Sequence, residues 1–247
     1  MSRIEEYRTI LAELDNWDSF LLQESRLPGP RANLELAFAA ASEGDEALFQ
    51  RYAKLDELCA PANTQEEFLA VCGVLGLGYL AARGQTDHLV ALRKSASDSR
   101  WRIREAVALG LQKCGKEDMA GLVKEMESWM KGNAYERRAV VATLCEPALL
   151  SDPNWAMRTF DILDDVTSSV VEEQDRRSDS FKTLRKGLGY GWSVVVAAQP
   201  DIGKARMEKW IDVEDKDVRW IMKQNLKKKR LVRMDEEWVE AQLDRLV

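Results

Sequence analysis

Apolar residues recur along this chain at the spacing of one helix face. One such stripe begins after Arg102 and continues at positions i, i+4, i+7, i+8 and i+11, which lie on the same side of an α-helix. Residues 218–226 repeat this spacing with a single polar position, Asn225. The chain has no sustained apolar–polar alternation and no Asn-Gly or Asp-Gly turn. The pattern predicts an all-helical protein. The first stripe consists of Ile103, Val107, Gly110, Leu111 and Cys114.

Four segments of the chain share one longer pattern. Each begins with a short polar cluster that contains Asp or Asn, continues with basic residues, and ends in an apolar helical stripe. The polar residue is expected to cap the N-terminus of the helix that follows. Arginines at equivalent positions, Arg104, Arg137, Arg185 and Arg219, fall 33, 48 and 34 residues apart. The segments are 97–112, 132–144, 178–192 and 214–226.

A second repeat supports the same period. The tetrapeptide MESW at 126–129 recurs as MEKW at 207–210, 81 residues later, which equals the first two arginine steps together. A helix pair of this length cannot bury its apolar side alone, so neighbouring pairs must stack. The pattern resembles HEAT repeats and predicts a right-handed α-solenoid of about six HEAT/ARM-like helix pairs. We expect one domain over 1–247, with caps at 1–31 and 234–247, irregular repeats at 32–96 and regular repeats at 97–233.

Composition narrows the class of protein. The chain has 247 residues, 45% hydrophobic and 32% charged, which suits a packed core. Its opening residues do not form a signal peptide, and the longest apolar stretch is too short and too Gly-rich to span a bilayer. We therefore expect a cytoplasmic protein with no membrane partner. Because the four cysteines form no CxxC pair and the only histidine is His88, we expect buried thiols, no metal and no cofactor.

The charges are segregated along the chain. The net charge is −6, yet four segments that follow the basic repeats, 97–115, 131–145, 178–193 and 215–233, hold 18 basic and 6 acidic residues. The intervening segments, 116–130, 153–177 and 199–214, hold 8 basic and 14 acidic residues. Second helices line the concave side of HEAT-like stacks, so this predicts a basic inner groove for an anionic partner. The candidate anion- or nucleic-acid-binding residues are Arg102, Arg104, Arg137, Arg138, Lys182, Arg185, Lys186, Tyr190, Arg219, Lys223, Lys227 and Arg230.

A second interpretation of the same charges stays open. HEAT proteins commonly pair Asp and Arg between repeats, so Asp98 with Arg137, or Asp217 with its neighbours, can pair inside the stack. The last repeat is the most basic, and Arg219, Lys223, Lys227 and Arg230 are expected to share one helix face at i, i+4, i+8 and i+11. Exposed lysines of this kind can also be a solvated surface.

Two blocks resemble the DNA alkylation repeat family. TLRKGLGYGW (183–192) is similar to that family's Phe-Val-Arg-Lys-Ala-Ile-Gly-Trp helix, and AYERRAVV (134–141) is similar to its aromatic-x-Arg-Arg-Ala helix. The resemblance implies glycosylases that hold duplex DNA in a basic groove, with Arg137 or Arg138 as the groove arginine and Tyr190 at the aromatic position. Where the family has Trp-Asp-x-Val-Asp, this chain has RWRIREAVALG with Glu105, so the catalytic carboxylate is unplaced.

Three functions follow from these observations. The first is a binding or scaffold protein whose basic groove takes duplex DNA or another anionic partner, including an acidic protein. The second is a DNA N-glycosylase for alkylated bases, and the third is a protein–protein scaffold without a nucleic-acid role. Trp101 and Trp220 adjoin basic residues, and each is expected in the core, over an arginine, or stacked on a base. No complete catalytic constellation is present, so a non-enzymatic role is favoured.

Overall fold

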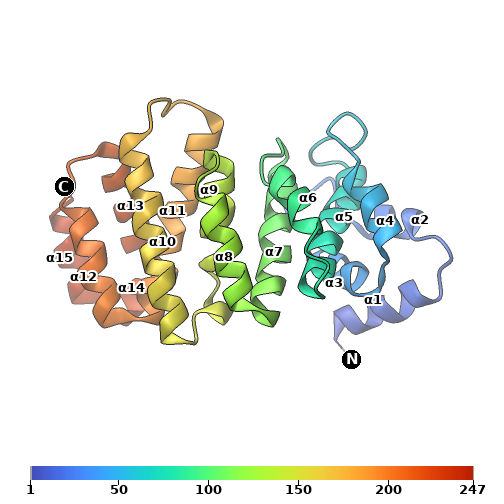
Figure 1. Ribbon diagram of the computed structural model, residues 1–247, viewed down its shortest axis with the longest axis horizontal. Helices are drawn as coiled ribbons and strands as arrows, with labels where there is room; N and C mark the ends of the chain where they lie inside the picture. Colours follow the sequence, from blue (N-terminus) through green and yellow to red (C-terminus); the bar gives the residue numbers. More distant parts are fainter. Residues whose placement is uncertain (1, 247) are drawn as a thin grey trace. The chain divides into compact units, whose positions relative to one another are not determined.

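The computed structural model describes residues 2–246, and every regular element in this range is helical (Figure 1). This confirms the predicted all-α class, an α-solenoid of stacked helices. The described residues form two compact units, 2–118 and 119–246. Unit 1 contains α1 (Arg3–Ala12), α2 (Asp18–Glu24), α3 (Leu34–Glu43), α4 (Glu46–Ala53), α5 (Gln65–Ala82), α6 (His88–Ser95) and α7 (Trp101–Glu117). Unit 2 contains α8 (Met119–Trp129), α9 (Ala134–Leu144), the 3-10 helix η1 (Pro147–Leu149), α10 (Pro153–Glu172), α11 (Asp179–Ala198), α12 (Pro200–Ile211), α13 (Lys216–Leu226), α14 (Lys229–Met234) and α15 (Glu236–Asp244).

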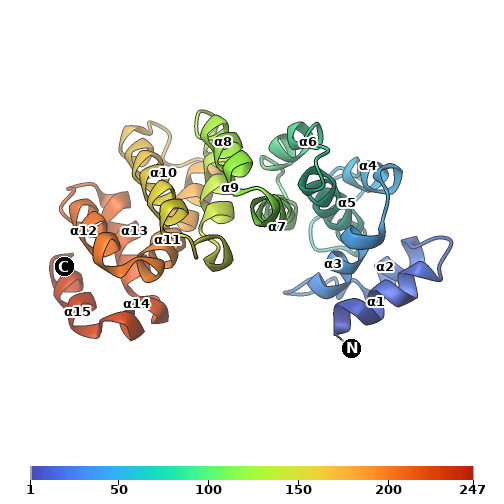
Figure 2. The same cartoon turned by 60° about the horizontal axis from the view of Figure 1, so that its bottom comes forward.

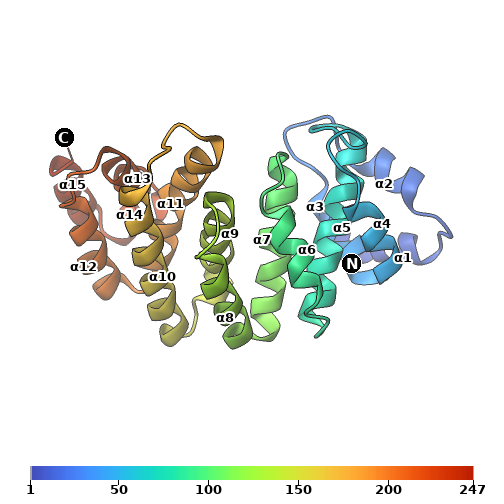
Figure 3. The ribbon, with the colours of Figure 1, turned by 45° about the horizontal axis from the view of Figure 1, so that its top comes forward.

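Helix α5 is the centre of unit 1. It is apolar on nearly every side, so α3, α4, α6 and α7 can pack around it (Figure 3). Its contact with α7 depends on two facing glycines. A Cβ atom built on Gly78 would lie 2.4 Å from the Cα atom of Gly110, a distance that no side chain tolerates. This close approach holds α7, the first of the basic helices, against the core of the unit.

Unit 2 has two layers of helices. Figure 2 shows α9, α11 and α13 in one layer and α8, α10 and α12 in the other. Trp192 of α11 is fully buried between the layers, where its indole N–H donates to the hydroxyl of Thr167 on α10 over 3.0 Å. Asn225, the polar position in the apolar stripe of α13, is also buried. Its side chain accepts a hydrogen bond from the Ser193 N–H and donates to the Leu188 carbonyl, both over 2.8 Å, so it joins α13 to α11.

The four predicted basic helices are present as α7, α9, α11 and α13. The long step of 48 residues arises because a 3-10 turn, the 20-residue helix α10 and the loop 173–178 lie between Arg137 and Arg185. Asn133, Ser178 and Asp215 cap the last three helices, as the polar clusters predict. The first cap was predicted wrongly, because α7 begins after Arg100 without a side-chain cap. Asp98 instead accepts hydrogen bonds from the backbone and side chain of Arg100.

The glycine run at 187–191 lies inside α11, as predicted from its apolar stripe. A Cβ atom on Gly191 would lie 2.8 Å from Val141 and 2.9 Å from the Cys145 sulfur, so this glycine lets α11 pack closely on α9. Cys145 is buried, and burial raises the pKa of its thiol far above the ordinary range. The expectation of buried thiols is wrong for Cys59, which is exposed in the turn before α5.

The described residues lack membrane-spanning helices and metal-binding clusters. Between residues 2 and 246, no helix has both the length and the apolar character that crossing a bilayer requires. Within the same range, no cluster of three or more His, Cys, Asp or Glu side chains is arranged to hold a metal ion.

Candidate nucleic-acid interface

A stripe of side chains on α11 faces solvent. Lys182, Lys186 and Tyr190 stand four residues apart and are all exposed, whereas Leu184 and Leu188 of the same helix are buried. Because α9 and α13 lie on either side of α11 and α10 packs behind it, this stripe occupies the open side of the layer. Here, the local periodicity of the sequence directly determines which residues reach solvent.

Helix α13 adds two lysines to this open side. Lys223 is half-buried and Lys227 is exposed at the end of the helix. Near them, Gly189 of α11 faces the side chains of Trp220 and Gln224, so the two helices are in direct contact at this level. Among residues 2–246, no side chain pairs with Lys186, Lys223 or Lys227, while Lys182 forms an exposed ion pair of 3.2 Å with Asp179. These lysines therefore carry charge that the fold itself does not use.

Tyr190 is the centre of a cation–aromatic cluster on the same side. The guanidinium carbon of Arg230 lies 4.6 Å from the centre of its ring, and the ammonium of Lys228 lies 5.7 Å from it. Arg230 also donates a hydrogen bond to the Tyr190 hydroxyl. The ring remains 47% exposed. We call Lys182, Lys186, Tyr190, Lys223, Lys227, Lys228 and Arg230 the basic face of unit 2.

The predicted ridge of four basic residues on a single helix is wrong in one respect. Helix α13 ends at Leu226, and Lys228 has extended backbone angles, so Arg230 belongs to the next helix, α14. The positive side chains at this boundary suit the partial negative charge of a helix C-terminus. Arg230 joins the site by stacking on Tyr190, and Arg219 binds the carbonyl oxygen of Arg245 over 3.3 Å.

Arg185 does not share the exposure of its neighbours. Its guanidinium donates to the carboxylate of Asp217, which is 2% exposed, and stacks 4.5 Å from the centre of the Trp220 ring. Arg176, from the loop before α11, binds the same carboxylate over 3.1 Å and Asp215 over 2.7 Å. Asp217 and Arg185 are one repeat apart, so the inter-repeat pairing predicted for Asp217 is present. The charge of Arg185 is neutralised within the fold.

Arg102 and Arg104 of unit 1 are also used within the protein. Arg102 is 6% exposed, and it binds the buried carboxylate of Glu67 over 3.0 Å and the carbonyl oxygen of Gly29 over 2.6 Å. Arg104 is buried and donates to the carbonyl oxygens of Asp98 and Ser99. Neither guanidinium is open to a polyanion, although both belong to a segment that the repeat pattern marks as basic.

Next to Arg102, unit 1 contains an apolar pocket of about 280 Å³. Its walls come from the loop 25–33, α3, α5 and α7. Arg102 shapes this pocket by binding Gly29 in the loop while its guanidinium stacks 4.6 Å from the centre of the Trp101 ring. Trp101 is 51% exposed, and Glu105 follows it by one helical turn on the same wall. Of the three sequence expectations for Trp101, the position over an arginine is correct and the core position is wrong.

The adjacent arginines of α9, Arg137 and Arg138, lie against different helices. The Cγ atom of Arg138 lies 3.3 Å from a Cβ position on Gly187, beside α11. Arg137 lines a pocket of about 500 Å³ between α8 and α10, in the other layer of unit 2. The repeat pattern did not reveal this pocket, because its walls come from three separate segments, and a repeat does not show which of its residues face the same space.

Comparisons with known proteins agree on the fold. No protein-family model and no curated protein sequence matches the chain. Two crystal structures from Streptococcus mutans are similar in fold. AlkD2 has 17% sequence identity and a TM-score of 0.57, with 91% of this chain and 96% of that chain covered. The protein smu.31 of strain UA159 has 18% identity and a TM-score of 0.58, with 91% and 98% covered. The chain therefore has an AlkD-like fold.

Proposed function

We propose that this protein binds the phosphate backbone of duplex DNA through the basic face of unit 2. The observation that carries the proposal is the set of lysines on α11 and α13 whose charge has no ion-pair partner among residues 2–246. Unpaired cations on one side of an acidic protein attract a polyanion, and each phosphate contact releases a counterion from the DNA. The exposed Tyr190 ring, held by Arg230, adds a flat surface against a sugar or base.

The fold supports this proposal without specifying a sequence preference. HEAT-like stacks present long rows of second helices, and a layer of such helices gives a duplex several contacts at once. Backbone contacts fix the position of a protein on DNA but read no bases. We therefore propose binding that depends strongly on salt and weakly on sequence.

The test is duplex binding measured by fluorescence anisotropy over a series of salt concentrations. Lys223→Glu with Lys227→Glu should weaken binding at low salt, and the slope of log K against log salt should fall by about 0.9 for each lost phosphate contact. Lys227→Glu alone should be compared with Lys209→Glu. Both residues are exposed and neither has an ion-pair partner within 2–246, but Lys209 lies on α12, in the other layer.

The result also separates DNA from an acidic protein partner. If the wild type binds no duplex at low salt, or if the two single reversals have the same effect, the basic face is not a DNA site. Retention of an acidic protein by the wild type and its loss in the Lys223/Lys227 variant would then favour the protein scaffold.

A second candidate function is a DNA N-glycosylase, and the pocket of unit 1 favours it. Trp101 and Glu105 occupy the first and fifth places of WRIRE, where the DNA alkylation repeat pattern Trp-Asp-x-Val-Asp has its Trp and its last Asp. A carboxylate beside an exposed aromatic ring can stabilise the positive charge that develops on a sugar during base release. The test is release of alkylated bases from duplex DNA by the wild type and by Glu105→Gln. No release by the wild type would reject this function.

A further inference from the structure

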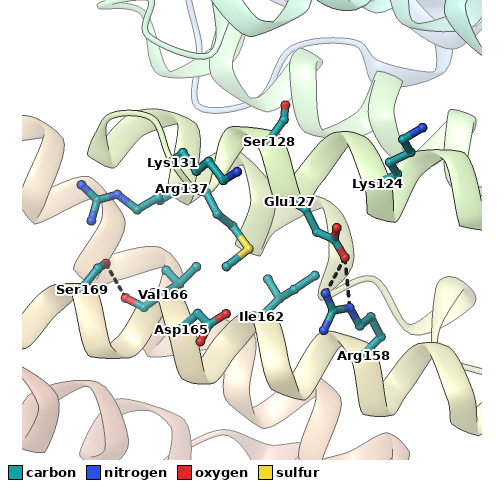
Figure 4. A pocket seen from close by; sticks show the side chains of 11 residues that line it. Lys124, Glu127, Ser128, Lys131, Arg137, Arg158, Ile162, Asp165, Val166 and Ser169 are labelled. Carbon is teal, nitrogen blue, oxygen red and sulfur yellow. Dashed lines mark hydrogen bonds and ion pairs between the residues drawn. The ribbon is translucent and has the colours of Figure 1, made fainter.

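We propose that the pocket between α8 and α10 of unit 2 binds a phosphate monoester of a small molecule of about mononucleotide size. Figure 4 shows its lining residues, with α8 on one side and α10 on the other. Its volume of about 500 Å³ lies within the range of ordinary small-molecule sites. Lys131 and Arg137 lie on one side of it, and a closed ion pair between Arg158 and Glu127 lies at one end.

Arg137 is the group in this pocket that most needs a ligand. Its Nε atom is buried without a hydrogen-bond partner. Among residues 2–246, its guanidinium also forms no ion pair. Buried polar atoms without partners are rare in folded proteins, and they often mark a place for an ion or ligand. A guanidinium offers a planar fork of donors that fits two oxygens of a phosphate group.

The charges around the pocket match a doubly charged anion. Lys124, Lys131 and Arg137 have no ion-pair partner within 2–246, and neither does Asp165, whereas Arg158 is neutralised by Glu127 over 3.1 Å. Three positive groups against one negative group leave a net charge of +2. A phosphate monoester carries about −1.5 to −2 at neutral pH, while a carboxylate carries only −1. The balance therefore favours phosphate over carboxylate.

The remaining lining residues indicate the chemistry of the rest of the ligand. Met130, Ile162 and Val166 give the pocket an apolar side, which suits a compact carbon skeleton or ring. Asp165, also on α10, is an acceptor for a hydroxyl or amino group of the ligand. Ser169 already donates to the carbonyl oxygen of Val166 over 2.7 Å, so its hydroxyl oxygen is left as an acceptor too. A phosphorylated molecule with hydrogen-bond donors uses all of these groups.

This site is separate from the basic face. The pocket lies in the layer of α8 and α10, while the basic face lies on the open side of α11 and α13. No residue belongs to both. The proposal therefore does not depend on DNA binding, and the two can succeed or fail independently.

The experiment is isothermal titration of the full chain with three probes. They are adenosine 5′-monophosphate, adenosine and inorganic phosphate. We expect the monophosphate to bind most tightly and adenosine not to bind measurably. Arg137→Gln should weaken the binding of the monophosphate by about tenfold to a hundredfold, which is the usual effect of losing a charged hydrogen bond. Lys131→Gln, at an exposed position, gives a second measure if the first variant does not fold. Lys209→Gln on α12 is the matched control and should change nothing.

Asp165→Asn sharpens the test because it should change the binding of two probes to different degrees. Removing its negative charge should strengthen the binding of inorganic phosphate, because a repulsion is lost. The binding of adenosine 5′-monophosphate should become weaker relative to that of inorganic phosphate. The proposal is overturned if no phosphate probe binds, if adenosine binds as well as its monophosphate, or if Lys131→Gln and Lys209→Gln have equal effects. Loss of monophosphate binding on Lys223→Glu would also overturn it, because the ligand would then occupy the basic face.

Discussion

The two units place the basic residues of equivalent helices in opposite environments. In unit 1, Arg102 and Arg104 of α7 are buried and bind groups of the protein itself. In unit 2, Lys186 and Lys223 of the equivalent helices α11 and α13 have no ion-pair partner within residues 2–246. The sequence pattern predicts all four residues as binding residues of a basic helix, although only the two lysines offer charge to a ligand.

The difference follows from side-chain chemistry and from nearby acids. A guanidinium has five donors in a fixed plane, so it can satisfy several buried acceptors at once, whereas an ammonium is strongly hydrated and costly to bury. Unit 1 also supplies the buried carboxylate of Glu67 for Arg102. In unit 2, the buried carboxylate of Asp217 is already held by Arg176 and Arg185, so it is not available to the lysines. A basic helix is therefore a candidate interface only where it has more cationic side chains than neighbouring segments have buried carboxylates to pair with them.

The largest expected effect comes from breaking the buried pair of unit 1. Arg102→Ala should lower the free energy of unfolding by about 3–5 kcal/mol, because it leaves the fully buried Glu67 carboxylate without a partner. Urea unfolding followed by circular dichroism measures this loss. Replacing both partners with Arg102→Met and Glu67→Leu should recover much of the stability. A loss below about 1 kcal/mol for Arg102→Ala would mean that the arginine is a surface cation after all.

The corresponding change in unit 2 should have a smaller effect. Asp217→Ala should cost about 2–3 kcal/mol, because Arg176 and Arg185 lose a shared acceptor but keep some contact with water. The same unfolding measurement applies. Asp179→Ala is the control, since its pair with Lys182 is exposed and should be worth less than about 1 kcal/mol. Equal losses at Asp217 and Asp179 would remove the distinction between paired and free cations in unit 2.

The helical stack was predictable from sequence because it depends on local periodicity. The stripes at 103–111 and 218–226 are buried as their spacing indicates, and only Cys114 at the end of the first stripe is half-buried. Asn225 keeps its place in the second stripe through its hydrogen bond to α11. The exposed stripe of α11 follows from the same argument. These features need only the position of each residue on its own helix.

The candidate sites were less predictable because they depend on which segments meet. The environment of Arg102 depends on Glu67 and Gly29, which lie 35 and 73 residues away along the chain. The pocket of unit 1 needs the loop 25–33 against α7, and the pocket of unit 2 needs α8 against α10. The sequence pattern treated residues 1–96 as cap and support, so it gave no role to the loop 25–33 that forms one wall of the pocket in unit 1. The spacing of residues along the chain does not show which distant segments come into contact.

An exposed arginine of unit 1 tests whether the stability contributed by an ion pair depends on its burial or on the unit that contains it. Arg51 binds Asp18, and this hydrogen-bonded pair lowers the pKa of the Asp18 carboxyl. A carboxyl whose pKa is lower in the folded state stabilises the fold above its unfolded pKa, and this contribution is lost as the pH falls through the folded value. Asp18→Asn should therefore cost less than about 1 kcal/mol at pH 7, and the difference from the wild type should vanish in acid. Asp15→Asn, at an exposed site with no partner among the described residues, should show no such pH dependence.

The smallest effect on stability is expected for a lysine of the basic face. Lys186→Ala should change the free energy of unfolding by no more than about 0.5 kcal/mol, because the side chain is exposed and has no ion-pair partner within 2–246. Its effect should appear in duplex binding instead, where the salt slope should fall by about 0.9, the share of one phosphate contact. Lys209→Ala should leave both quantities unchanged. If Lys186→Ala destabilises the fold and leaves binding intact, then the lysines of unit 2 serve the same structural purpose as the arginines of unit 1, and the proposed contrast between the units is wrong.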